Sequence, residues 1–109
     1  MAEHDFRYEN LDVWRVALEV AHEVQRTRFP AGLSAVKSQA VRSSASICLN
    51  IAEAQGHKDG NRARHYRIAL GSAEETAAAL DVALVHNRVA QRERLGRICR
   101  MLQGLLRKC

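Results

Sequence analysis

Helical spacing of apolar residues constrains this chain most, because it extends over nearly the whole length. Apolar side chains recur every three or four residues, which places them on one face of an α-helix. Only one proline and six glycines are present, too few turn residues for a β-sandwich or barrel. The 109 residues are 47% hydrophobic and 27% charged, which suits one packed domain. The pattern therefore predicts an all-α single domain.

Four helical segments are separated by short breaks. We expect them at about residues 10–28, 34–56, 59–86 (beginning at 59 or 61) and from about residue 90 onward. Pro30 and Gly32 form the first break, and Ser34 is expected to cap the second helix. Connections this short force neighbouring helices to run antiparallel. The prediction is an up-down-up-down four-helix bundle over residues 10–109, preceded by a polar arm at residues 1–9.

The inward face of each helix is expected to carry its larger apolar side chains. These are Leu11, Trp14, Leu18, Ala21 and Val24, then Leu33, Val36, Ala40, Ile47, Cys48 and Ile51, then Tyr66, Ala69, Leu70, Ala73, Ala77, Leu80 and Leu84, and finally Leu95, Ile98, Cys99, Leu102, Leu105 and Leu106. Because few aromatic residues are present, aliphatic side chains must fill most of the core.

A second apolar face lies away from these positions on the first and third helices. Its residues are small or β-branched: Val13, Val16, Val20, Ile68, Gly71, Ala78, Ala79 and Val82. One interpretation is a wide core face with harmless surface alanines. The other is an oligomer interface, which we favour because valine and isoleucine are poor choices for a solvated helix.

The positive charge is concentrated at the end of the chain. The net charge is +5, and residues 88–109 contain seven basic residues and one acidic residue. Arg97, Arg100 and Arg107 share one side of the expected fourth helix, with Arg92 and Arg94 flanking them. Arginine suits phosphate, so this stripe is a candidate nucleic-acid-binding surface directed at the backbone. The alternative is a solubilising charged face.

Catalytic and metal patterns are not evident. The five histidines, His4, His22, His57, His65 and His86, form no zinc motif in the sequence, and no phosphate-binding glycine loop is present. Cys48, Cys99 and Cys109 contain no CxxC pair, and free thiols are expected. We therefore expect no enzyme activity, cofactor, metal or small-molecule substrate. The polar N-terminus and the lack of a long apolar run indicate a cytoplasmic protein without a membrane partner.

Three ordered motifs resemble the 23S rRNA-intervening-sequence proteins, also called four-helix-bundle proteins. The first motif is Asn10-Leu11-Asp12-Val13-Trp14, which resembles the opening of the family's sequences. The second, Ser46-Ile47-Cys48-Leu49-Asn50-Ile51-Ala52-Glu53, is similar to the family's SIPxNIAEG stretch, with Cys48 in place of proline. The third is Ile68-Ala69-Leu70-Gly71-Ser72 followed by Glu75. Together they cover about residues 6–85, and none lies in the expected fourth helix.

The resemblance implies an antiparallel four-helix bundle that assembles as a ring-shaped homopentamer. It implies no catalytic residues, and it leaves Asn50, Glu53 and Glu75 as structural motif residues. Asn50 and Glu53 lie one turn apart, either in a hydrogen-bonded interface strip or on solvated surface. The accessory variability proteins of diversity-generating retroelements are related to this family, bind nucleic acid and attach to a reverse transcriptase. The expected function is therefore non-enzymatic binding of nucleic acid, or of an enzyme such as a reverse transcriptase. A structural scaffold without a nucleic-acid role is the alternative.

Overall fold

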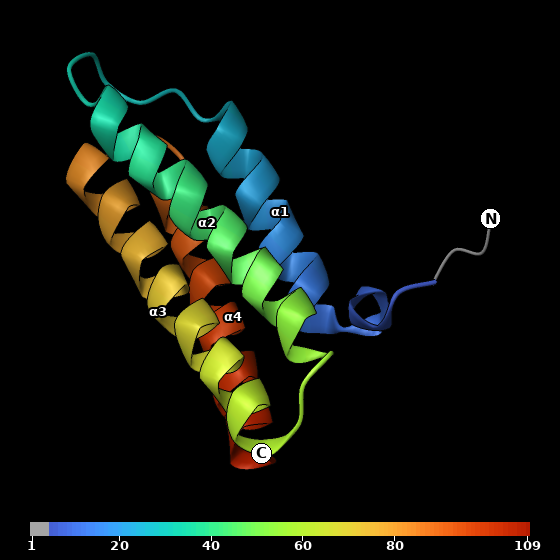
Figure 1. Cartoon of the computed structure of the whole chain (residues 1–109). Coiled ribbons are helices and arrows are strands. Elements are labelled where there is room, and N and C mark those ends of the chain that lie inside the picture. The colour runs from blue at the N-terminus through green and yellow to red at the C-terminus, as the bar shows by residue number, and fades with distance from the viewer. Residues whose placement is uncertain (1–4) are drawn as a thin grey trace.

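Four long α-helices account for most of the chain, as the apolar spacing predicts (Figure 1). The computed structural model describes residues 5–109, so residues 1–4 of the predicted polar arm, including His4, lie outside the described residues. The helices are α1 (Asp12–Arg26), α2 (Ser34–Ala54), α3 (Asp59–Ala83) and α4 (Arg88–Arg107), and a short 3-10 helix, η1 (Arg7–Asn10), precedes α1. No strand occurs within residues 5–109, which confirms the all-α prediction.

The helices form a four-membered bundle in which each packs against two others. α1 contacts α2 and α4, and α3 contacts the same two helices. The connection between α1 and α2 lies at one end of the bundle, and the connection between α2 and α3 lies at the other end, beside the C-terminus (Figure 1). The contact between α2 and α3 is the most extensive of the four.

Small polar side chains lie between α2 and α3. The Ser43 and Thr76 hydroxyls are 2.6 Å apart and share a buried hydrogen bond. One turn further along, the Ser72 hydroxyl donates to the Ser46 hydroxyl at 2.9 Å. Small residues let the two helix backbones approach closely, and the paired hydroxyls meet their hydrogen-bonding requirement inside the contact. This is why α2 and α3 pack so extensively.

The centre of the core is aliphatic, as expected. The largest fully buried apolar side chains are Val20, Val24, Ile47, Ile51, Leu80, Leu95, Ile98 and Leu102. Trp14, which we expected on the inward face of α1, lies at the edge of the core. Its ring meets Tyr8 of η1 edge-on at 4.3 Å between centroids, so η1 covers this edge.

The end of α3 differs from the sequence prediction. We expected a helix to His86 with Leu84 pointing inward, but α3 ends at Ala83 and Leu84 is 70% exposed. Leu84 adopts a left-handed conformation with φ of 51°, which reverses the chain direction. Val85 is buried in its place. The prediction for Leu84 is therefore wrong because α3 ends three residues earlier than expected.

The helix starts also shift by one or two residues. Ser34 is the first residue of α2, and Leu33 rather than Ser34 occupies the cap position. α4 begins at Arg88 after Asn87, whose amide donates to the Thr27 hydroxyl at 3.0 Å. This bond ties the turn before α4 to the end of α1. Over residues 5–109, no helix is long and apolar enough to cross a bilayer.

Candidate functional site

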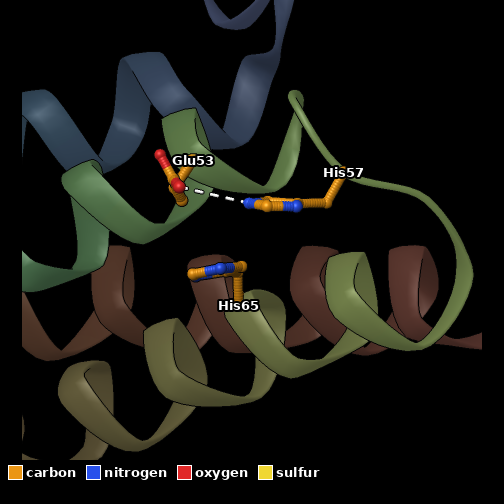
Figure 2. Close-up of side chains that lie close together, drawn as sticks. All are labelled: Glu53, His57 and His65. Carbon is orange, nitrogen blue, oxygen red and sulfur yellow. Dashed lines mark hydrogen bonds and ion pairs between the residues drawn. The ribbon is translucent and has the colours of Figure 1, made fainter.

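Three side chains that can bind a metal or exchange protons meet where α2 leads into α3 (Figure 2). Glu53 lies in the last turn of α2, His57 follows in the connecting loop, and His65 lies on α3. The His57 Nε2 atom lies 3.1 Å from the Glu53 carboxylate. The two imidazole rings stack with their centroids 4.9 Å apart. One ligand atom from each residue lies within 4.8 Å of the others.

Asn50 holds His65 in this cluster from the neighbouring helix. Its Nδ2 group donates to the Ser46 carbonyl at 2.9 Å and to the Ser46 hydroxyl at 3.1 Å. Its Oδ1 atom lies 3.0 Å from Nδ1 of His65. Asn50 therefore joins α2 to α3, as expected for a hydrogen-bonded strip.

The loop backbone around His57 is fixed by an arginine at the start of α3. The Arg62 Nε–H group is shared between the carbonyl oxygens of Ala54, at 3.1 Å, and His57, at 2.8 Å. A carbonyl at a helix C-terminus lacks an intrahelical partner, and a charged donor meets that need. The position of His57 relative to Glu53 is therefore set by the backbone as well as by the side-chain contact.

Two of the histidines, His57 and His65, lie together although the sequence contains no zinc motif. His57 and His65 are eight residues apart in the sequence, which matches no standard ligand motif. The loop turns the chain so that α3 returns beside α2, and this brings the two rings together (Figure 2). One signal was available: Glu53 and His57 are four residues apart at a helix end, a spacing that allows contact.

The three structural motif residues, Asn50, Glu53 and Glu75, differ in their contacts. Asn50 bridges two helices, whereas Glu53 contacts the loop that follows its own helix. Glu75 is exposed on α3, and within residues 5–109 it forms no side-chain hydrogen bond or ion pair that meets ordinary distance limits.

The arginines of α4 separate into two groups. All five predicted nucleic-acid-binding residues, Arg92, Arg94, Arg97, Arg100 and Arg107, are exposed. Arg92 pairs with Asp81 at 2.5 Å, and Arg94 lies 3.8 Å from Glu19. Arg97, Arg100 and Arg107 form no ion pair within the described part of the chain. The charge of the second group is therefore available to an external anion.

The residues of the predicted oligomer interface divide into a buried group and an exposed group. Val13, Val16 and Val20 are buried in the core of the chain itself, and Ala79 is buried too. Ile68, Gly71, Ala78 and Val82 are exposed. The valines of α1 thus cannot supply a surface for another subunit, because α2 and α4 cover them.

The cysteines are free, as expected, and their surroundings differ. Cys48 is buried in α2, Cys99 is half-buried and Cys109 is exposed. Burial raises the pKa of the Cys48 thiol from its ordinary value of 9.0 to about 11. Burial also raises the pKa of Cys99. Both thiols are therefore poor nucleophiles at neutral pH.

The fold and these surfaces define an all-α protein built as one four-helix bundle. Residues 9–108 match the family described as 23S rRNA-intervening sequence protein. The chain therefore belongs to this family. The match continues through α4, beyond the three motifs that carried the resemblance. A comparison with curated proteins gives no significant match.

Proposed function

We propose that this family member is a non-enzymatic homo-oligomer that binds the nucleic-acid backbone through α4. One observation carries the proposal: Arg97, Arg100 and Arg107 are exposed on one helix without an acidic partner among residues 5–109. Arg92 and Arg94, by contrast, are partly neutralised by Asp81 and Glu19. The binding residues of the proposal are therefore the three unpaired arginines, and the flanking pair contributes less.

The chemistry of the stripe favours phosphate over bases. A guanidinium group offers a planar fork of donors that matches a phosphate. Each phosphate that is neutralised releases counterions from nucleic acid, so binding weakens as salt rises. α4 contains no aromatic residue on which a base could stack. Binding is therefore expected to be weakly sequence-specific.

Assembly strengthens this proposal because it repeats the stripe. Leu49 of α2 and Ile68 and Val82 of α3 are exposed apolar residues, and they are the proposed subunit contact. The proposed assembly is a ring-shaped homopentamer of antiparallel up-down-up-down bundles, and the alternating connections of Figure 1 support that topology. Five copies of the stripe would produce a stronger field than one.

The direct test is nucleic-acid binding by a triple variant, Arg97→Gln, Arg100→Gln and Arg107→Gln. Fluorescence anisotropy with labelled RNA and DNA would be recorded over a range of salt concentrations. We expect weaker binding to both, with the slope of log affinity against log salt reduced by up to about 3 per chain. The matched control is the double variant Arg92→Gln and Arg94→Gln on the same helix, which should lose less. Equal losses in both variants would contradict the proposal.

A nucleic-acid enzyme such as a reverse transcriptase is the protein partner that we propose for the same surface. The support is the basic face of α4, together with the resemblance in sequence that implies a relationship to the retroelement accessory proteins. Such an enzyme could be captured directly or through its bound RNA. Pull-down of a purified reverse transcriptase before and after nuclease treatment separates these routes, and the triple variant should lose capture.

A structural scaffold is the second candidate, and the exposed Leu49, Ile68 and Val82 favour it. In that case assembly is the function and the arginines confer solubility only. An intact oligomer that shows no salt-dependent binding to RNA or DNA would support the scaffold over the first proposal.

A further inference from the structure

We propose that Glu53, His57 and His65 form a binding site for a divalent transition-metal ion of the Zn²⁺ type. None of the three residues lies on α4, the helix that contains the arginine stripe. Two imidazoles and one carboxylate make a ligand set that zinc accepts, with the remaining coordination position taken by water. Imidazole ligands disfavour Mg²⁺ and Ca²⁺, which prefer oxygen.

The distances allow the three groups to reach one ion. One ligand atom from each residue, a ring nitrogen in the case of the histidines, lies within 4.8 Å of the other two. Zinc–nitrogen and zinc–oxygen bonds of about 2.0–2.2 Å in a tetrahedron place neighbouring ligand atoms about 3.4 Å apart. The stacked rings of His57 and His65 must turn from their parallel arrangement so that their lone pairs converge. Rotation about side-chain bonds achieves this without a change in the helices.

The hydrogen bonds of Asn50 prepare one of the two histidines for a metal. The Ser46 carbonyl can only accept, so it fixes the Asn50 amide with Nδ2 toward Ser46 and Oδ1 toward His65. Because Oδ1 accepts, Nδ1 of His65 must carry the proton. The lone pair of neutral His65 is then on Nε2, the atom left for a metal. Metal-binding histidines commonly donate their other N–H group in this way, which orients the ring.

The site is open to ions from solution but anchored in the fold. The Glu53 side chain is 60% exposed and the His57 side chain is 35% exposed. Arg62 fixes the backbone at His57, and Asn50 fixes the ring of His65. An ion could thus enter from solvent and meet ligands whose backbone positions are set beforehand and whose rings need only to turn toward it. Coordination would also cross-link the end of α2, the loop and α3.

The test uses metal-stripped full-length protein and Zn²⁺ in competition with a chromophoric chelator. We expect about one ion per chain and at least a tenfold weaker affinity in His57→Gln, His65→Gln and Glu53→Gln. Two exposed histidines outside the cluster supply matched controls, His22→Gln and His86→Gln, which should bind as the wild type does. A Cys109→Ser variant should also bind normally, which excludes the exposed thiol as a ligand. Circular dichroism would establish that each variant is folded.

Asn50 supplies a second test that separates positioning from simple stability. Asn50→Leu removes the acceptor and should weaken Zn²⁺ binding about 10- to 100-fold, whereas Asn50→Asp keeps an acceptor and should restore most of it. Co²⁺ bound in place of Zn²⁺ should show visible absorption bands that change in His65→Gln. Equal Zn²⁺ affinity in the wild type and the His57→Gln/His65→Gln double variant would overturn the proposal. So would loss of the bound ion in the His86→Gln or Cys109→Ser protein.

Discussion

The apolar residues of α1 and those on the outer side of α3 have opposite surroundings. On α1, Val13, Val16 and Val20 are buried in the core between α2 and α4. On α3, Val82 is 66% exposed, and Ile68 lies on the same outer side. Residues of the same type thus stabilise the single chain in one helix and remain available to a partner in the other. Valine alone does not distinguish a core position from an interface position.

The difference arises from which residues fill the inner face of each helix. On α3, Tyr66, Ala69, Ala73 and Leu80 occupy the inner face, so Val82 has no place there. On α1, the inner face consists of valines and alanines, while the larger Trp14 lies at its edge beside Tyr8. Size is therefore a poor guide to the centre of a core face when a neighbouring segment can cover a large side chain.

A carboxylate introduced at Val20 of α1 or at Val82 of α3 should give the largest difference in folding stability between two variants. Val20→Glu buries a carboxylate without a partner, at a cost of several kcal/mol, and we expect loss of the cooperative thermal transition. The same substitution at Val82 should leave the bundle folded, since the new side chain points into solvent. Circular dichroism melting curves of both variants measure this. A Val82→Glu protein that also fails to fold would refute the assignment of Val82 to the outside.

Assembly of the folded protein, in contrast, should depend on Val82 and not on the buried Val20. Val82→Glu places an unpaired charge in the proposed subunit contact, a cost of several kcal/mol, and should convert the oligomer into monomers. Light scattering combined with size-exclusion chromatography gives the mass. Val89→Glu is the matched control, because Val89 is exposed to a similar degree on α4. Wild-type protein that is monomeric at micromolar concentration would show that the exposed apolar residues of α3 do not contact a second copy of the chain.

Two adjacent residues of α2 differ in the same way, since Cys48 is buried and Leu49 is exposed. The Cys48 thiol has a pKa of about 11 in the folded chain and about 9 when unfolded. Between these values the folded protein binds more protons than the unfolded protein, so the free energy of unfolding should fall as pH rises from about 9 to 11. The loss is at most about 2–3 kcal/mol. Denaturation at pH 8 and pH 10.5 measures it, and the pH dependence should be weaker in Cys48→Ala.

The smallest effect is expected at Leu84, where α3 stops. A left-handed conformation costs a residue with a Cβ atom about 1–2 kcal/mol, and glycine avoids most of this. Glycine also loses more conformational entropy on folding, which offsets part of this gain. The net increase in the free energy of unfolding of Leu84→Gly should therefore be about 0.5 to 1 kcal/mol. Urea denaturation measures the change. Leu84→Ala keeps the conformational cost and should give no gain, so a comparable gain there would argue against backbone strain as the cause.

The four helices and most of the core could be predicted because each helix repeats its apolar residues at the helical period. The orientation of α1 about its axis could not, since two adjacent faces are apolar and only the three-dimensional packing selects between them. The early end of α3 depends on a left-handed leucine, which local preference disfavours. The Glu53–His57–His65 cluster was not predicted because the path of the loop determines which residues of α2 and α3 meet.

The extensive contact between α2 and α3 has a consequence for how the chain folds. These helices are consecutive in the sequence, so their contact closes only a short loop and loses little chain entropy. We expect this helical hairpin to form early, with α1 and α4 adding to it from either side. Its amides should then exchange with deuterium more slowly than those of α1, because opening the hairpin requires nearly global unfolding. Hydrogen exchange followed by mass spectrometry would measure this order, and faster exchange in α2 and α3 than in α1 would contradict it.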